Sequence, residues 1–466
     1  MYGSDLGAAG TNFGVGSAQE VEELNKALTA GYGRGGNQAD GGIGAPLRVE
    51  SLEATLKVTT FSERNIVFWK DIPKLPAFNT VEEFNQLNGY GTAGGYFVPE
   101  GVAPQESDSS YARKTVQVKY VGSLRKVTHQ MTLVRPAHGD VIALETMNGT
   151  REILRTVEES LFNGDSACVA QEWDGFEKQF YDGIGTEYGD ENILDLRGQA
   201  LAEATLGEAA RVIIDNYGFP TAMYCGFETM TDLNNLFLPR ERVSLNAANP
   251  GVAGFALQQF MTAGGAYAFR PSVFIKPGET GATVAVGAAA SIPVAAGVSV
   301  AGVAGASSGA ASLLGAGTYK YAVVLENRFG KTARIESANV TATAGQQVTL
   351  TVSGLTANSA TSMRVYRSVG AAGTGAIKFM KRVPIAANAT STTFVDKDFD
   401  VPGTSKAYLM QVDLDVMSFK QLAPFTKIPL ATIDPSIRWM QLLYGTPALY
   451  VPRRMVLLKN IGKATA

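Results

Sequence analysis

The segment that most limits how this chain can fold is its first 44 residues, which contain 12 glycines. One short helix is predicted within it, over residues 19–30, with an apolar face formed by Val21, Leu24 and Leu28. Glycine supplies no side chain to bury and costs more conformational entropy to order than other residues. Because the segment cannot build a core of its own, we expect residues 1–50 to form an arm that becomes ordered only against another surface.

The composition of the 466 residues is that of a globular protein, with 45% hydrophobic and 18% charged residues. A chain of this length exceeds one ordinary core, so we expect two or three packed units. Lys and Arg number 40 against 43 Asp and Glu, a formal charge of -3, which disfavours a strongly cationic DNA-wrapping protein. Modest basic clusters at residues 240–242, 381–382 and 453–454 are interpreted as surface charge, with subunit pairing or weak DNA contact as the alternative.

The two cysteines, Cys168 and Cys225, have neither a CxxC spacing nor a Cys/His cluster around them. We expect both to be buried thiols in a reducing compartment. Residues 281–317 carry no charge and could imitate a membrane span. They are mostly Gly, Ala and Ser and alternate at strand period, so we expect strands there and no membrane segment. The start of the chain shows no secretory signal.

Two rows of alternating apolar residues predict a long β-hairpin. An isolated two-stranded ribbon is marginal in water, so this one is expected to gain stability from a neighbour. Just before it, Thr80 and Glu83 fit a capping box that predicts a short helix through Leu87. The two rows are Val116, Val118 and Tyr120 before a turn at residues 122–123, and Val127, His129 and Met131 after that turn.

The longest helical signal covers residues 140–161. Glu158 and Glu159 are expected on its solvated face or in pairs with a neighbour's arginine. The apolar positions of this helix are Met147, Leu154, Val157 and Leu161.

The rest of the chain divides into a mixed part and an all-β part. Residues 281–404 show short alternating segments separated by turn-forming residues, which is typical of a β-sandwich. The mixed pattern then resumes and ends in an apolar strand at residues 455–458. The body is therefore predicted to be α+β. Its further predicted elements are helices from residue 205 and over 228–237, and strands over 222–225 and 272–275.

Several sequence segments have a familiar order. A glycine-rich arm with Leu-Thr-Ala-Gly-Tyr-Gly at residues 28–33 precedes the hairpin, and the long helix ends in Glu-Ser-Leu-Phe-Asn-Gly-Asp at residues 159–165. Ile-Leu-Asp-Leu-Arg-Gly follows at residues 193–198. In this order the segments resemble the major capsid proteins of tailed phages, in particular those of large myovirus-type phages. The resemblance covers roughly residues 20–280 and 405–466.

The resemblance implies an α+β, HK97-like shell fold, in which the arm and the hairpin reach across neighbouring subunits and the long helix is a spine. The implied parts are an arm at 1–50, a peripheral domain at 51–88 and 135–194 with the spine helix at 140–161, an extended loop at 89–134, an axial domain at 195–280 and 405–445, and a C-terminal strand of the peripheral domain at 446–466. The expected subunit-interface residues are Val21, Leu24, Leu28, Val116, Val118, Tyr120, Val127, His129 and Met131.

The all-β part has a resemblance of its own. Gly-Thr-Tyr-Lys-Tyr-Ala-Val-Val at residues 317–324, Arg-Val-Tyr-Arg-Ser at 364–368 and Thr-Phe-Val-Asp at 393–396 resemble a fibronectin type III or related immunoglobulin-like domain. Such a domain at residues 281–404 would be an insertion into the shell fold.

The sequence offers little for catalysis. The only histidines are His129 and His138, and no nucleophile and base have a spacing that would assemble a catalytic site. The GxGxxG match at residues 89–94 lacks the helix that a phosphate site needs, and Gly-Lys-Thr at 330–332 is interpreted as a hairpin turn. We therefore expect no catalytic residue, no cofactor and no metal.

The function that the resemblance implies is a major capsid protein, which self-assembles as hexamers and pentamers into the icosahedral head shell around the phage genome. Such a protein is structural, resides in the virion and is assembled in the host cytoplasm. Portal, scaffold or cement proteins would be further partners, and packaged double-stranded DNA would be touched weakly. Two alternatives remain open: an encapsulin-like nanocompartment shell, and a cell-surface adhesin with a fibronectin-like module.

Overall fold

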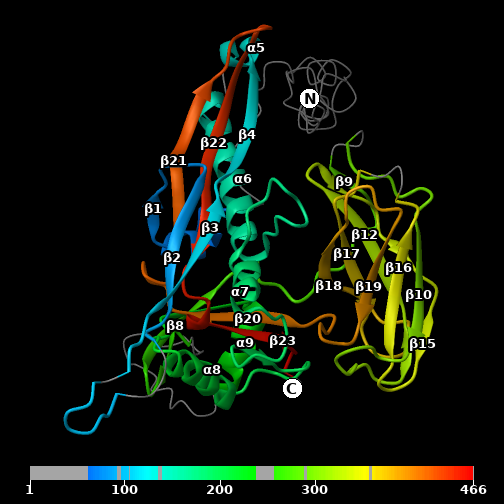
Figure 1. The fold of residues 1–466 in the computed structure, drawn as a ribbon. Helices are drawn as coiled ribbons and strands as arrows, with labels where there is room; N and C mark the ends of the chain where they lie inside the picture. The colour runs from blue at the N-terminus through cyan, green and yellow to red at the C-terminus, as the bar shows by residue number, and fades with distance from the viewer. Residues whose placement is uncertain are drawn as a thin grey trace, which may run out of the picture. The chain divides into compact units, whose positions relative to one another are not determined.

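The chain has a mixed α and β structure, with more residues in strands than in helices (Figure 1). All of the elements named below belong to one compact unit, Val58–Leu133 with Val141–Ala466. The predicted arm, with Val21, Leu24 and Leu28, lies outside the described residues, as does His138. This computed structural model describes residues 61–91, 96–103, 105–134, 139–237, 257–287, 291–355 and 359–464.

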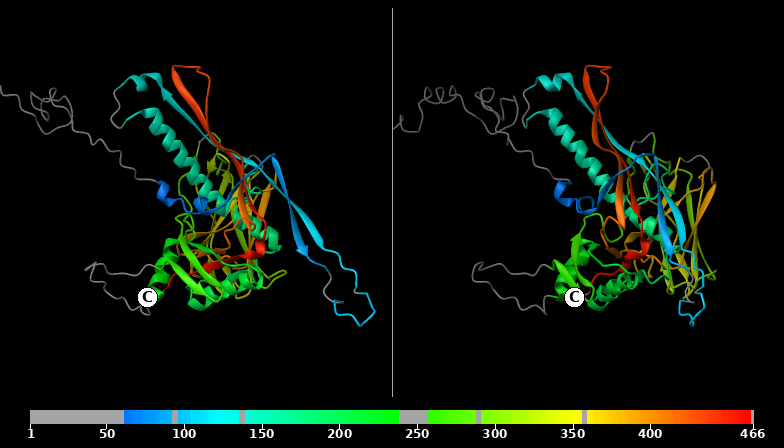
Figure 2. Two further views of the ribbon diagram at one scale, coloured as in Figure 1. Left: turned by 90° about the vertical axis from the view of Figure 1, so that its left-hand side faces the viewer. Right: turned by 60° about the vertical axis from the view of Figure 1, so that its left-hand side comes forward.

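A four-stranded sheet lies against the longest helix, α6 (Val141–Asn163) (Figure 1, Figure 2). Helix and sheet approach closely at Gly149, where an added Cβ would lie 2.0 Å from Oε1 of Gln441 on β22. Gln441 also donates from Nε2 to the carbonyl of Thr146 at 2.7 Å. The spine helix predicted over residues 140–161 is thus confirmed. We call this sheet the spine sheet; in spatial order its strands are β1 (Lys74–Pro76), β21 (Met417–Pro429), β22 (Ser436–Leu449) and β4 (Lys119–Thr128).

A six-stranded sheet packs against two further helices, α8 (Glu203–Asp215) and α9 (Phe227–Phe237). Leu206 of α8 and Leu233 of α9 are buried together with Met223 of the sheet, so the helices and the sheet share one apolar core. We call this sheet the end sheet; in spatial order its strands are β5 (Ile193–Asp195), β23 (Met455–Ile461), β20 (Ser405–Met410), β6 (Ala222–Cys225), β8 (Gly265–Pro271) and β7 (Gln259–Thr262).

The strand predicted at residues 222–225 is confirmed as β6, and the helices predicted from residue 205 and over 228–237 are confirmed as α8 and α9. The strand predicted at residues 272–275 is wrong, because β8 ends at Pro271. Residues 405–445, expected in the axial part, are divided between the two sheets, with β20 in the end sheet and β21 and β22 in the spine sheet. Residues 446–466, expected in the peripheral part, contain β23, which pairs with β20 in the end sheet. Which distant strand a segment pairs with is not encoded in its local pattern.

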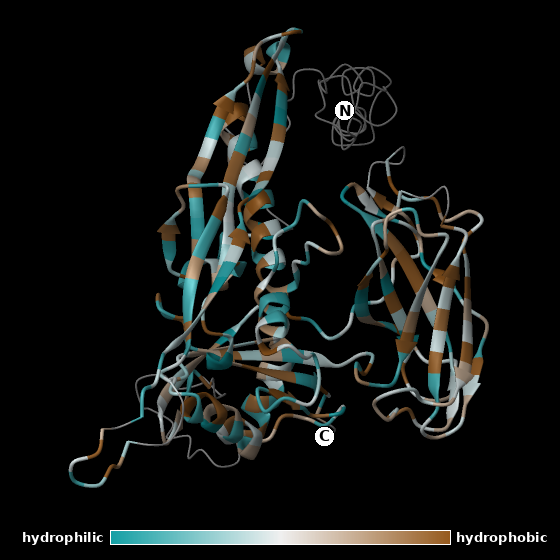
Figure 3. Cartoon of the chain, in the orientation of Figure 1, coloured by the Kyte–Doolittle hydropathy of each residue, from teal (hydrophilic) through white to brown (hydrophobic). Residues whose placement is uncertain are grey.

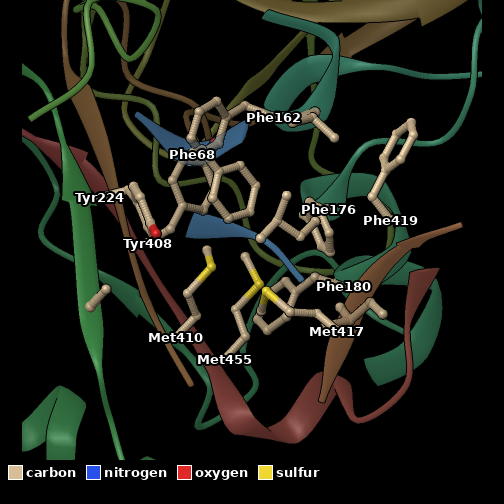
Figure 4. Close-up of a cluster of buried hydrophobic side chains, with 14 of the residues drawn as sticks. Phe68, Phe162, Phe176, Phe180, Tyr224, Tyr408, Met410, Met417, Phe419 and Met455 are labelled. Atoms are coloured by element: carbon tan, nitrogen blue, oxygen red, sulfur yellow. The ribbon is translucent and has the colours of Figure 1, made fainter. Parts of the chain in front are cut away.

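A central apolar core connects the spine helix with both sheets (Figure 4). Phe68, in the short helix α4 (Phe68–Asp71), stacks on Phe162 of α6 with ring centroids 4.9 Å apart. It also meets Tyr224 of β6 edge-on at 4.7 Å. Helix α7 (Phe176–Ile184) adds Phe176, whose ring lies 5.1 Å from that of Phe68. The spine sheet, the end sheet and their helices therefore form one body.

A two-stranded antiparallel ribbon extends from this body (Figure 2). Its strands are β2 (Val81–Gly89) and β3 (Ser110–Gln117), and Phe84 pairs with Lys114. We use the word ribbon for these strands and the described residues of the tip between them. The helix predicted from Thr80 through Leu87 is therefore wrong, since that segment is a strand.

The predicted turn at residues 122–123 is also wrong. β4 runs unbroken through it and pairs with β22, with Gly122 opposite Leu442. Gly122 fits there because an added Cβ would lie 2.4 Å from Cδ2 of Leu442. His129 and Met131, expected in the second strand row, lie instead in the short helix α5 (His129–Leu133).

The segment between residues 286 and 396 contains two main sheets that enclose a core of their own. Tyr321, Val323, Val348, Leu350 and Val365 are completely buried in it. The short alternating sequence segments predicted strands at residues 319–325, 348–352, 363–366, 377–383 and 392–395. These are confirmed as β12 (Tyr321–Asn327), β16 (Gln347–Ser353), β17 (Ser362–Ser368), β18 (Ile377–Pro384) and β19 (Ser391–Asp396). We call this part the sandwich; it has sheets β10–β16–β19 and β18–β17–β12–β13–β9, with β14 beside β12, and the pair β11–β15.

The sandwich strands are β9 (Val286–Gly287), β10 (Ser299–Gly305), β11 (Gly317–Tyr319), β12 (Tyr321–Asn327), β13 (Gly330–Lys331), β14 (Ile335–Glu336), β15 (Val340–Ala342), β16 (Gln347–Ser353), β17 (Ser362–Ser368), β18 (Ile377–Pro384) and β19 (Ser391–Asp396). Two 3-10 helices lie at Glu63–Asn65 and Pro452–Arg454.

Candidate assembly surfaces

The ribbon has no buried face within its own subunit. Along β2 and β3 the side chains are exposed or half-buried, and Tyr111 is 72% exposed. The ribbon is anchored at Tyr450, whose ring meets that of Phe84 edge-on at 4.9 Å and whose carbonyl accepts a hydrogen bond from Gln86 at 2.6 Å. Two strands alone are marginal in water. A strand pair built in this way is stabilised when a partner covers it.

The tip of the ribbon carries apolar side chains in full contact with solvent. Phe97 is completely exposed, Tyr90 is 86% exposed and Val102 is 56% exposed. Figure 3 shows brown, hydrophobic stretches on the loop that continues beyond β2 and β3. A gathering of exposed apolar side chains marks an interaction site in a soluble protein. Sequence reasoning considered residues 89–94 as a match to a phosphate-binding loop and missed these residues, although the aromatics in this glycine-rich stretch were the available signal.

The spine sheet offers a second apolar surface, on its face away from α6. β4 is an edge strand of this sheet, and its Tyr120 and Leu124 are 57% and 63% exposed. The ring of Tyr120 lies edge-on to that of Tyr444 on β22 at 5.0 Å. Leu124 pairs with Met440 in the register. An exposed edge strand with apolar neighbours is a natural place for another chain to dock.

The spine helix is fixed from within by a buried carboxylate. Glu158 is completely buried and accepts hydrogen bonds from the backbone nitrogens of Val67, Phe68 and Trp69, at 3.1, 2.8 and 2.9 Å. The expectation that Glu158 lies on a solvated face is therefore wrong, whereas Glu159 is exposed. Burial raises the pKa of Glu158, and the three backbone donors act against that rise. The carboxylate holds the start of α4 on the spine.

The structure places the predicted interface and spine residues in three different environments. Val118 and Val127 are buried within the subunit and contribute to its own packing. Of the described interface residues, Tyr120, His129 and Met131 are exposed and Val116 is half-buried. In α6, Val157 and Leu161 are fully buried, Leu154 is half-buried and Met147 is 39% exposed; the buried Ile153 and Phe162 were not predicted.

The basic residues Lys381 and Arg382 form ion pairs inside the subunit. Lys381 pairs with Glu187, and Arg382 pairs with both Glu172 and Glu326. The interpretation as surface charge is therefore wrong for Arg382, whose side chain is 12% exposed, whereas that of Lys381 is 33% exposed.

Both cysteines are buried free thiols, as predicted. No helix among the described residues is long and apolar enough to cross a membrane. Within those same residues, no three His, Cys, Asp or Glu side chains gather as metal ligands would.

No protein-family model matches the chain. Several curated proteins named major capsid protein are, however, 26% identical to it. For the protein of Staphylococcus phage S25-3, the alignment covers 95% of this chain and 96% of that relative. The similarity therefore includes the body, the sandwich and most of the residues that the structure does not describe.

Among solved structures, one of Mycobacterium phage Adephagia is similar to this chain with a TM-score of 0.45 at 8% identity, covering 91% of this chain and 97% of that chain. The holo-SrpI encapsulin complex from Synechococcus elongatus PCC 7942 has a TM-score of 0.39 at 9% identity, covering 90% and 95%. The assignment rests on the sequence relatives, which are phage proteins, so the nanocompartment alternative is the weaker one. These relatives are named major capsid protein and align with nearly the whole chain, and this protein acts as a major capsid protein of the virion.

Proposed function

We propose that the protein forms the icosahedral head shell as an HK97-like subunit, in hexamers and pentamers, and that its ribbon is one of the main contacts between copies. The observation that carries this proposal is the ribbon itself. It has no buried face in its own subunit, and Phe97 at its tip is completely exposed. A second copy offers a matching apolar surface around Tyr120 and Leu124 of the spine sheet.

Shell stability follows from repetition of such contacts. A single contact of this kind can be weak, but each subunit makes several at once and the closed shell has no free edge, so the whole is hard to take apart. The arm over residues 1–50, with Val21, Leu24 and Leu28, supplies a second contact of the same kind in this proposal. Portal, scaffold or cement proteins and weakly held DNA are its further partners.

We further propose that residues 281–404 are an immunoglobulin-like domain inserted into the shell fold. Support comes from the place where the two ends of this segment meet: the backbone nitrogen of Gly278 donates to the carbonyl of Thr404 at 3.2 Å. A segment that leaves and rejoins the body at one point can be added without disturbing the body's core. Its own apolar core, around Tyr321 and Leu350, fits an independent domain.

The shell function is tested by replacing the tip residues Phe97 and Val102 with serine. Both side chains are largely exposed, so the double variant should fold like the wild type, with an unchanged circular dichroism spectrum and thermal midpoint. Assembly should fail or require much more protein, because each tip contact is repeated in every subunit. Sedimentation velocity and electron microscopy of the purified protein measure this directly.

A matched control is Phe219→Ser, which removes another exposed aromatic (63% exposed) from a loop after α8. This control should assemble normally. Particles of normal size and yield from the tip variant would refute the role of the ribbon. A wild-type protein that stays monomeric under every condition would refute the shell.

A further inference from the structure

The sandwich contacts the body through a row of charged side chains. We propose that this row is an ionic seam that latches the sandwich onto the body in one orientation, with Arg382 as its central residue. These contacts lie within a single subunit. The latch can therefore be tested on the unassembled chain, independently of the proposed shell function.

Arg382, on β18, joins the two parts directly. Its Nη1 donates to Oε2 of Glu172 at 2.8 Å, and Glu172 belongs to the body segment between α6 and α7. Its Nη2 donates to Oε1 of Glu326, on β12 of the sandwich, at 3.0 Å. The side chain of Arg382 is only 12% exposed. One nearly buried guanidinium therefore bridges a carboxylate of the body and a carboxylate of the sandwich.

The row continues beyond Glu326. Arg364 donates from Nε to Glu326 at 2.6 Å and from Nη1 to Glu279 at 2.8 Å. Burial raises the pKa of Glu326, but Arg364 and Arg382 outweigh this effect and the pKa is lowered, so the carboxylate stays ionised. Glu279 lies just before the sandwich in the chain. Negative and positive groups thus alternate along the seam, and each inner group has an opposite charge on either side.

A second set of contacts lies next to the first. Lys381, beside Arg382 in sequence, pairs with Glu187 of the body loop that follows α7. In the same loop, Tyr188 donates from its hydroxyl to Asp400 at 2.9 Å, and its ring lies 4.5 Å from that of Phe399. This loop therefore holds both the strand β18 and the segment by which the chain leaves the sandwich. Contacts at two places oppose rotation as well as separation.

The seam borders a cavity of about 360 Å³, lined by Arg364, Lys381 and Arg382 of the sandwich and by Glu177 and Lys406 of the body. A cavity of this size that is lined by charged groups has room for water. Dissolved ions screen the more exposed pairs, Arg364 with Glu279 and Lys381 with Glu187, more strongly than the nearly buried pairs of Arg382. The latch should therefore be closed at low ionic strength and loosen as salt is added.

The chain contains a reporter of this opening. Cys168 lies in the same body segment as Glu172 and is 1% exposed. Burial raises its pKa to about 12, and the charges of Arg382 and Glu326 both act on it, so the thiol lies next to the seam. Cys225, on β6, is fully buried in the end-sheet core. The second thiol reports global unfolding and serves as the internal control.

The test compares the wild-type chain with Arg382→Gln, by the rate at which a soluble aromatic disulfide reagent modifies each thiol. In the wild type, labelling of Cys168 should accelerate as NaCl is raised from about 0.05 to 1 M. In Arg382→Gln, labelling at low salt should be about tenfold faster, because Glu172 loses its partner and the seam opens. The salt dependence of that variant should largely disappear. Labelling of Cys225 should stay slow throughout.

The matched control is Arg211→Gln, which removes a guanidinium that pairs with Glu208 and Asp215 on α8, outside the seam. Its Cys168 should react at the wild-type rate. The proposal is overturned if Arg382→Gln labels Cys168 no faster than the wild type, or if the wild-type rate does not change with salt. It is also overturned if Cys168 and Cys225 accelerate together, since the variant would then unfold as a whole rather than release the sandwich.

Discussion

The carboxylate of Glu158 caps the short helix that begins at Phe68, accepting a hydrogen bond from its backbone nitrogen at 2.8 Å. The nitrogens of Val67 and Trp69 complete the cap. The ring of Phe68 lies at the centre of the core that joins α6 to both sheets. The carboxylate of Glu158 therefore positions Phe68, around which the central apolar core packs.

Replacing Glu158 with leucine should destabilise the subunit by about 3–5 kcal/mol, because three backbone donors lose their acceptor inside the core. Urea denaturation followed by circular dichroism measures the change. Glu159→Leu, one residue along the same helix on an exposed position, is the matched control and should change the free energy of unfolding by no more than about 0.5 kcal/mol. Equal effects of the two substitutions would contradict the cap.

The sequence was informative where a segment buries one side within its own subunit. The helices α6 and α8 show the expected periodicity for that reason. The strand β6 is buried along its whole length and was predicted as a short apolar run. β2 was mistaken for a helix because neither of its faces is fully buried in the subunit. Its half-buried side alternates at a period of two but carries the polar Glu82 and Gln86 beside Phe84, so the apolar residues of the strand do not alternate. Its apolar residues, including Val81 and Leu87, followed a helical spacing by coincidence.

Other features depended on distant parts of the chain. Glu158 looked like an ordinary surface acid, since its partners are backbone groups about 90 residues away. The pairing of β23 with β20, rather than with the spine sheet, is likewise set by tertiary packing. The exposed tip of the ribbon could have been inferred from aromatics placed among glycines. The charged seam at Arg382 could not, because its carboxylates, Glu172, Glu187, Glu279 and Glu326, come from four separate segments.

Gly149 should resist replacement even by alanine. In a helix, Gly→Ala normally stabilises by up to about 1 kcal/mol. Here the new Cβ would lie 2.0 Å from Oε1 and 3.0 Å from Cδ of Gln441, so we expect Gly149→Ala to destabilise by about 1–3 kcal/mol. Gly207→Ala in α8, where nothing lies within 4 Å, should stabilise. Adding Gln441→Ala should lessen the penalty at Gly149; a Gly149→Ala variant as stable as Gly207→Ala would disprove the close contact.

Alkaline conditions should weaken the fold through its buried thiols. Burial raises the pKa of Cys225 to about 12, against an ordinary value of 9.0. Between these two values the unfolded chain releases a proton that the folded chain keeps. The contribution of this thiol to stability is thus complete below about pH 9 and is lost as the pH rises, at about 1.4 kcal/mol per pH unit. Denaturation at several pH values should show a shallower decline for Cys225→Ala than for the wild type, and parallel declines would contradict the shift.

Removing the sandwich should leave the body intact. When residues 281–403 are replaced by a short Gly-Ser linker, the ends to be joined are already hydrogen-bonded through Gly278 and Thr404. Neither body core contains a residue of the deleted segment. The shortened chain should be soluble, keep the helical circular dichroism signal of α6 and still assemble to some extent. A chain that fails to fold at all would show that the sandwich is an integral part of the body.

The hydrogen bond between Gly278 and Thr404 brings the two ends of the inserted segment together on the body. The body requires of a guest at this position only that its two termini lie close together. An unrelated enzyme or antigen that meets this condition could be grafted there, and every copy in the particle would then carry it. The position now occupied by the sandwich is therefore a site at which foreign domains can be displayed on the particle.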